Sequence, residues 1–193
     1  MKKYLSFIAY FSLCSVLVCS CFKMAYAGAD EFIKNGDAFS AQGKYAEAKD
    51  MYNKALKINP NISKPYIGLA NACIVEGNLK EAENMYKKAL KINPKIEQAC
   101  NVLGYIYRNQ GKYKEAESMF KKALALNPKN EQVCAGLGDV YKNEKKNTEA
   151  EAMYKKALEI NPKNKVAYNG LGDILRDQGK MEEAKEMYIK SSK

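Results

Sequence analysis

The sequence contains no histidine and no tryptophan among its 193 residues, and only five prolines. The lack of histidine excludes Ser-His and Cys-His nucleophilic pairs and every metal site with a histidine ligand. No C-x-x-C pair is present either. The remaining residues offer no nucleophile–base pair and no set of metal ligands, so we predict that the chain is not an enzyme and uses no cofactor.

A short string recurs along the chain at a constant period. AENMYKKALKINP begins at Ala82, and edited copies begin at Ala48, Ala116 and Ala150. The prolines that end these four copies are each 34 residues apart: Pro60, Pro94, Pro128 and Pro162. A strict period of this length predicts a solenoid built from one repeated supersecondary unit.

Each unit is predicted to be a helical hairpin. In the unit 63–96, residues 64–76 carry apolar side chains at the spacing of one helix face. Gly77 follows where a helix end favours a left-handed residue, and residues 80–92 form a second helix that Asn93-Pro94 stops. One hairpin buries too little apolar surface to be stable alone, so neighbouring units must stack.

Small and large residues alternate in fixed columns of the repeat. One column of small residues contains Gly36, Ala70, Gly104, Gly138 and Gly172, and the aromatic column contains Tyr52, Tyr86, Phe120, Tyr154 and Tyr188. The pattern resembles the tetratricopeptide repeat (TPR) family, most clearly in the third unit at Gly104, Tyr107, Ala116, Phe120, Ala123 and Pro128. The resemblance implies an all-α fold: a right-handed TPR superhelix (α-solenoid) of antiparallel helix pairs with about five repeats. The repeats are predicted at 29–62, 63–96, 97–130, 131–164 and 165–193, the last one partial.

Residues 1–27 have the pattern of a targeting segment. Two lysines precede an uncharged run over residues 4–22, and Ala25-Tyr26-Ala27 provides an A-x-A site. This pattern indicates a secretory signal cleaved after Ala27. The uncharged run is also long enough to remain as an N-terminal anchor, and the residues before Cys21 resemble a lipobox. All three alternatives place the repeats outside the cytoplasm, in a bacterial periplasm or secreted, because the lysines hold the N-terminus inside.

Cysteine and lysine usage favour structural roles. Cys100 and Cys134 occupy one column of adjacent repeats, about 8–10 Å apart, whereas a disulfide needs Cα atoms within about 7 Å. We therefore interpret the repeat cysteines as buried apolar side chains.

The net charge of +10 invites a nucleic-acid interpretation. However, acidic residues begin each second helix and lysines end it, which is typical of a solvated helix face, so we predict no nucleic-acid partner.

The fourth repeat departs from the others at its turn. Lys145 stands where the other units have glycine, and Asn147 replaces an apolar or aromatic residue. A left-handed lysine costs roughly 1 kcal/mol. We therefore expect this hairpin to exchange its amide hydrogens faster than the third.

The resemblance implies that a partner binds in the concave groove, which the first helices line. The predicted groove residues are Ile33, Ile67, Asn71, Ile74, Asn101, Tyr105, Arg108, Asp139, Lys142, Asn169, Asp173 and Arg176. The N-terminal part of this set is apolar and the C-terminal part polar, which suits an extended peptide with an apolar end and an acidic or polar end. Two sets also have ion-pair spacing on one helix: Asp139 with Lys142, and Asp173 with Arg176.

These observations predict a non-enzymatic interaction scaffold outside the cytoplasm that binds a peptide or partner helix and serves the assembly of an envelope or secretion complex. The alternative is a structural protein that self-associates through its repeat ends. Contact with a membrane is expected only through the N-terminal segment.

Overall fold

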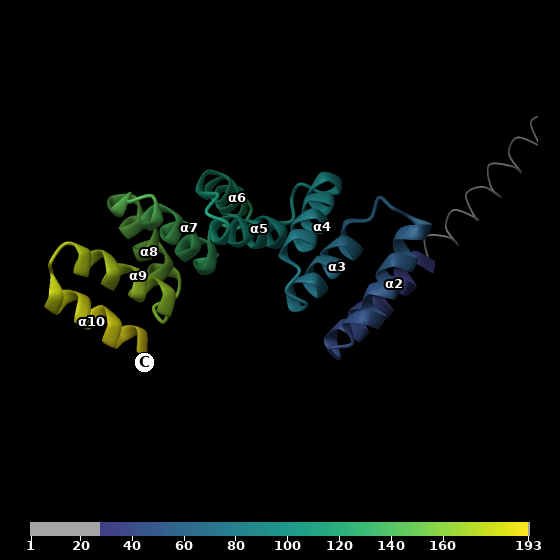
Figure 1. The fold of residues 1–193 in the computed structure, drawn as a ribbon, viewed down its shortest axis with the longest axis horizontal. Coiled ribbons are helices and arrows are strands. Elements are labelled where there is room, and N and C mark those ends of the chain that lie inside the picture. Colours follow the sequence, from purple (N-terminus) through teal and green to yellow (C-terminus); the bar gives the residue numbers. More distant parts are fainter. Residues whose placement is uncertain (1–27, 193) are drawn as a thin grey trace, which may run out of the picture. The chain divides into compact units, whose positions relative to one another are not determined.

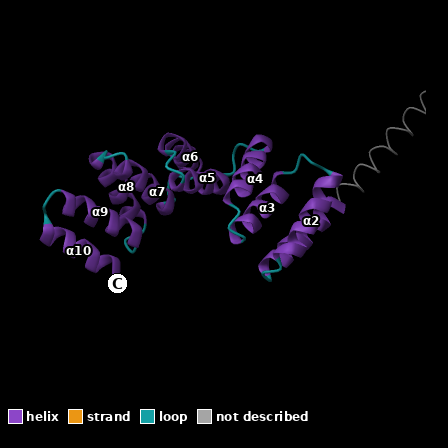
Figure 2. Ribbon diagram, viewed as in Figure 1, coloured by secondary structure: helices purple, strands orange, loops and turns teal. Residues whose placement is uncertain are grey.

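The computed structural model describes residues 28–192 (Figure 1). The predicted targeting segment, with the run 4–22 and Cys21, lies outside these residues. The described chain is made of helices joined by short loops, and none of residues 28–192 is in a strand (Figure 2). A helical segment at 28–41 is followed by nine labelled helices: α2 (Tyr45–Ile58), α3 (Ser63–Val75), α4 (Leu79–Ile92), α5 (Glu97–Asn109), α6 (Tyr113–Leu126), α7 (Glu131–Asn143), α8 (Asn147–Ile160), α9 (Lys165–Asp177) and α10 (Met181–Ser192).

The chain divides into two compact units, the first ending at Ile92 and the second beginning at Asn93. In the first unit α3 packs against α2 and α4. In the second unit each helix from α5 to α10 packs against the next, and α7 also contacts α5 and α9. The all-α prediction is confirmed, and the helices predicted at 64–76 and 80–92 agree with α3 and α4 to within one residue.

Glycines on two successive first helices enclose the aromatic ring of the second helix between them. A Cβ atom added to Gly138 would lie 2.7 Å from the Tyr154 ring, and one added to Gly170 would lie 2.2 Å from it. Gly36 and Gly68 enclose Tyr52 in the same way in the first unit. Real Cβ atoms do not approach other atoms so closely, so at these four positions only glycine lets the Tyr52 and Tyr154 rings pack at this depth.

The turn inside each hairpin requires a left-handed residue. Gly43, Gly77, Gly111 and Gly179 have φ between 73° and 79°. Lys145 adopts φ 60°, as the sequence predicted, and the amide of Lys146 still donates to the carbonyl of Tyr141 at 2.9 Å. The fourth turn thus keeps the hydrogen bonds of its glycine counterparts while its lysine bears the steric cost of the left-handed region.

The turn between successive hairpins begins with an Asn-Pro pair. The Oδ1 atoms of Asn59, Asn93 and Asn161 each accept from the backbone amide two residues ahead, at 2.9–3.0 Å. Such Asx turns satisfy a backbone donor where the following proline ends the helix. Proline ends the helix, and the asparagine side chain stabilises the turn that follows.

Candidate interaction surfaces

The first unit has an apolar surface on α3. Ile67 and Ile74 are partly exposed, and Val75 is 59% exposed. We call these three residues the α3 face. Ile33, predicted to lie in the groove, is only 5% exposed and belongs to the core of the first repeat, so its accessibility was predicted wrongly. Its side chain packs inward because removing an apolar side chain from water lowers the free energy of the folded state.

Asn71 lies on α3 beside this face and is oriented by a tyrosine. Its Oδ1 accepts a hydrogen bond from the Tyr86 hydroxyl. That bond directs the amide nitrogen away from Tyr86, and no group among residues 28–192 accepts from this nitrogen, so its two donors face outward for another group. Burial raises the pKa of Tyr86 to about 12, so the hydroxyl remains a donor at neutral pH.

The second unit carries two half-buried ion pairs that join successive repeats. Arg108 on α5 donates from Nη1 to Asp139 Oδ2 on α7 at 2.5 Å, and Lys142 on α7 donates from Nζ to Asp173 Oδ2 on α9 at 2.5 Å. The side chains of the first pair are 23% and 20% exposed. These cations are therefore already neutralised, and an acidic ligand would compete with a carboxylate of the same chain.

Each of these carboxylates also accepts from a tyrosine of its own hairpin. Tyr154 donates to Asp139 Oδ1 at 2.6 Å, and Tyr188 donates to Asp173 Oδ1 at 2.9 Å. One aspartate thus joins three helices: its own, the second helix of its hairpin and the first helix of the preceding hairpin. The Tyr154 ring is also the one that Gly138 and Gly170 enclose, so this ring and the Asp139 carboxylate fix one another's position.

The third repeat lacks both partners of this bond. Phe120 has no hydroxyl, and Tyr105 stands where other repeats have Asp37, Asn71, Asp139 and Asp173. Tyr105 instead sets its ring edge-on to Phe120, with centroids 5.1 Å apart, and donates from its hydroxyl to the Gln132 carbonyl at 2.8 Å. The two substitutions compensate one another, because a carboxylate above a phenyl ring would lose its donor.

These hydrogen bonds, together with burial, shift the pKa values of Asp173 and Tyr154. Burial raises the pKa of Asp173, but hydrogen bonds from Lys142 and Tyr188 outweigh burial, so the pKa lies below its usual range. Burial and the neighbouring carboxylate of Asp139 raise the pKa of Tyr154 far above its usual range. At neutral pH Asp173 is therefore ionised and Tyr154 is protonated.

The remaining predicted residues differ in accessibility. Asn169 is exposed, whereas Oδ1 of Asn101 is buried and has no hydrogen-bond partner among residues 28–192. Arg176 is mostly exposed and contacts Asp173 at 3.4 Å and Asp177 at 3.2 Å. The same-helix pair predicted for Asp173 and Arg176 is therefore present, while Asp139 pairs with Arg108 of the preceding repeat.

The described part of the chain shows no sign of metal or thiol chemistry. Among residues 28–192 no group of three or more acidic or cysteine side chains could hold a metal ion. Cys73, Cys100 and Cys134 are buried and free, and burial raises the pKa of each thiol. Within the same residues, no helix combines the length and apolar character that crossing a bilayer demands.

The sequence matches a family model over most of its length. The model is described as the C-terminal domain of cilia and flagella-associated protein 70, a TPR domain, and it matches residues 24–193. The chain belongs to this TPR family. A search of curated proteins finds no match to the TPR chain.

Solved TPR structures share the fold. A structure of MamA is 25% identical, with a TM-score of 0.73 over 81% of this chain and 91% of its own. PilF of Pseudomonas aeruginosa is 25% identical, with a TM-score of 0.74 over 87% and 77% of the two chains. YrrB, described as a TPR protein with an unusual peptide-binding site, is 24% identical, with a TM-score of 0.73 over 83% and 82%. The chain thus has the fold of a protein-interaction scaffold.

Sequence reasoning missed two features of the TPR chain. The first is the second glycine column, Gly68, Gly136 and Gly170, which encloses the ring from the far side. The second is the pairing of residues 31 positions apart, because the sequence comparison considered charges only within one helix. Both were visible as constant offsets: glycine two residues before the first column, and opposite charges three residues short of one period.

Proposed function

We propose that the TPR chain binds an apolar segment of a partner protein, either an extended peptide or a helix, on the α3 face. The scaffold is non-enzymatic and acts outside the cytoplasm in the assembly of an envelope or secretion complex. The observation that carries the proposal is the composition of α3. Ile74 and Val75 are apolar, whereas the equivalent positions of the next repeat are Arg108 and Asn109, and those of the later repeats are also polar.

Exposed apolar side chains on a helix favour a partner that removes them from water. Burying an isoleucine or valine side chain stabilises a complex by about 1.5–3 kcal/mol. Helix-in-groove recognition uses apolar anchors at spacings of three, four and seven residues, and Ile67 and Ile74 are seven residues apart, or two helical turns. The Asn71 amide nitrogen, directed away from Tyr86, supplies a donor for a carbonyl of the bound segment.

A site-specific photo-cross-linker tests the face. The photoreactive residue replaces Ile74 in one variant and Leu126 in a control, because Leu126 is also an exposed apolar residue but ends the second helix α6. We expect a discrete cross-linked partner from position 74 in the native host, and its loss when Val75→Asp is added. Equal cross-linking from both positions would contradict the proposal.

The cations of the second unit remain predicted contacts and need a test that preserves their ion pair. Exchanging the charges in Arg108→Asp with Asp139→Arg retains a salt bridge but inverts its direction. If Arg108 contacts an acidic part of the partner, the exchange weakens binding by tenfold or more. Unchanged affinity would limit Arg108 to a structural role.

The extracytoplasmic setting depends on residues 1–27. The mass of the mature N-terminus distinguishes its three fates: loss of the first 27 residues for cleavage, added acyl groups on Cys21 for lipidation, and the intact chain for an anchor. Recovery of the intact protein in the cytoplasmic fraction would contradict the setting without affecting the α3 face.

The alternative, self-association through a repeat end, draws on α10. Met181 and Ile189 on this helix are exposed apolar side chains. Light scattering over a hundredfold concentration range distinguishes the two functions. A mass that rises with concentration, and returns to that of one chain in Met181→Lys/Ile189→Lys, would favour the alternative.

A further inference from the structure

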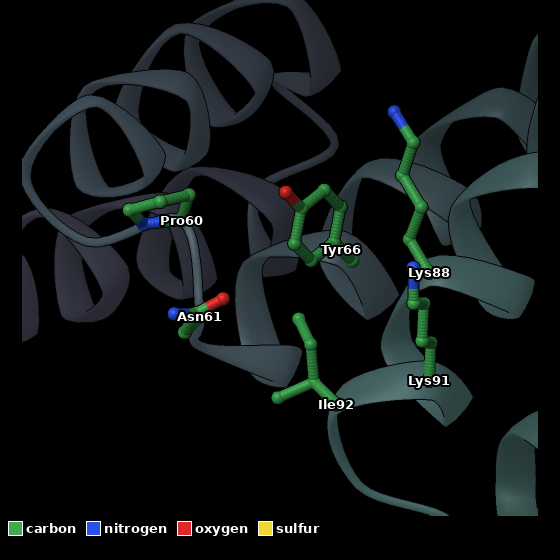
Figure 3. A pocket seen from close by; sticks show the side chains of 6 residues that line it. All are labelled: Pro60, Asn61, Tyr66, Lys88, Lys91 and Ile92. Carbon is green, nitrogen blue, oxygen red and sulfur yellow. The ribbon is translucent and has the colours of Figure 1, made fainter.

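A cavity of about 660 Å³ lies in the first unit, and no residue of the α3 face lines it (Figure 3). The residues that line it are Pro60, Asn61, Tyr66, Lys88, Lys91 and Ile92. We call it the Lys88 pocket. Pro60 and Asn61 belong to the turn before α3, Tyr66 to the first turns of α3, and the other three to the end of α4. Its volume lies within the range of about 300–1,000 Å³ that ligand pockets occupy.

The two lysines of the pocket carry charge that no carboxylate of residues 28–192 offsets through a salt bridge. Lys88 and Lys91 are exposed, and neither forms a salt bridge within residues 28–192. In the first repeat Lys54, one period before Lys88, pairs with Asp50, whereas the second repeat has Asn84 at the position of that aspartate. The pocket therefore presents two uncompensated cations three residues apart on one side of α4.

An aromatic and aliphatic floor lies beside these cations. The Lys88 ammonium stands 5.7 Å from the centroid of the Tyr66 ring, within cation–π distance. Ile92 and Pro60 add apolar surface next to the ring (Figure 3). The corresponding places in the third repeat are Cys100, Lys122 and Ala125, so that repeat has neither the ring nor the second lysine.

We infer that the Lys88 pocket binds an acidic segment of a partner protein in which an apolar side chain is flanked by carboxylates. The apolar side chain packs on Tyr66 and Ile92, and the carboxylates pair with Lys88 and Lys91. A segment of a larger chain fits better than a free small anion, because four of the six lining residues are exposed and leave the pocket open to the side. The pocket shares no residue with the α3 face, so the two proposals fail independently.

Fluorescence anisotropy with the full chain tests this inference. The probe is a labelled, end-blocked peptide, Asp-Glu-Phe-Glu-Asp, at an ionic strength of about 0.15 M, where long-range attraction is screened. Asn-Gln-Phe-Gln-Asn removes its charge, Asp-Glu-Ala-Glu-Asp removes its ring, and benzoate provides a free small carboxylate. Lys88→Glu/Lys91→Glu reverses the pocket charge, and Lys122→Glu/Lys129→Glu is the control with the same change in net charge at exposed lysines.

We expect the charge reversal at the pocket to weaken binding of the acidic peptide about tenfold, as the loss of two exposed ion pairs implies, and the control to change it less than about twofold. Both uncharged and alanine peptides should bind more weakly than the probe. Equal weakening by the two reversals, no measurable binding of the probe, or benzoate binding as tightly as the peptide would each overturn the inference. Unchanged circular dichroism establishes that the variants are folded.

Discussion

The two units use the same packing but differ in what their first helices present to solvent. In both, a ring from the second helix lies between two glycines. In the first unit α3 is apolar as far as Val75. Asp37 forms an ion pair with Lys64 there, and the two side chains are 42% and 61% exposed. In the second unit half-buried pairs tie each hairpin to the next. The same repeat can therefore supply either an apolar contact surface or ion pairs to the next hairpin, depending on the residues at two or three positions of its first helix.

The largest expected effect concerns what the units share. In Gly170→Ala the added methyl would collide with the Tyr154 ring, and in Gly68→Ala with the Tyr52 ring. We expect each substitution to lower the free energy of unfolding by about 3 kcal/mol, the upper part of the usual range for overpacking. Urea denaturation measures it. If helix propensity dominated instead, both variants would gain about 1 kcal/mol.

The next prediction concerns the third repeat, in which Phe120 and Tyr105 replace the hydrogen-bonded tyrosine and aspartate of the fourth repeat. Phe120→Tyr places a hydroxyl where Tyr105 offers no carboxylate, so we expect a loss of about 2 kcal/mol from a buried group without a partner. The double variant Phe120→Tyr/Tyr105→Asp restores the arrangement of the neighbouring repeats and should recover most of that loss. A neutral single variant would contradict the compensation between the two positions.

Double-mutant cycles compare the ion pairs of the two units directly. We expect the coupling between Arg108 and Asp139 to be about 1.5 kcal/mol, because both side chains are largely withdrawn from water. The exposed pair of Asp37 and Lys64 should couple by about 0.5 kcal/mol or less. Alanine substitutions at the four positions and chemical denaturation provide both values, and equal couplings would remove the contrast between the units.

The hairpin turns give a smaller contrast. Lys145→Gly should stabilise the protein by about 0.5–1 kcal/mol, because glycine adopts the left-handed conformation without the steric cost. Gly77→Lys should lose a similar amount in the first unit. Amide hydrogen exchange locates the change, since Lys145→Gly should slow exchange in α7 and α8 more than elsewhere.

The smallest effect is a dependence on acid. Asp173 has a folded-state pKa below its unfolded value, so its contribution is complete above about pH 4 and is lost as the pH falls through the folded-state pKa. Asp173→Asn should therefore destabilise the protein at pH 7 and leave its stability less dependent on pH between about 4 and 2. A variant with the same acid dependence as the parent would contradict this assignment.

Much of the fold was accessible from the residues alone, and the site was accessible only in part. The period, the stop at each Asn-Pro pair and the left-handed Lys145 follow from local geometry, which is why sequence predicted them. Ile33 was misplaced because helical spacing identifies a face but not whether a neighbouring element covers it. The carboxylate partners of Arg108 and Lys142 were missed because spacing along one helix says nothing about a carboxylate on the next one.

The repeated hairpin follows from the amino-acid sequence, since the 34-residue periodicity, the turn glycines and the aromatic column act within one or two helices and leave few alternative packings. Which polar groups are already satisfied depends instead on how the hairpins pack. The packing brought Arg108 to Asp139 and Lys142 to Asp173, and among residues 28–192 it left Lys88 and Lys91 without a salt bridge. The physical reason is that an ion pair depends on distance in space and on exposure to water, and both arise only when one hairpin is set against another.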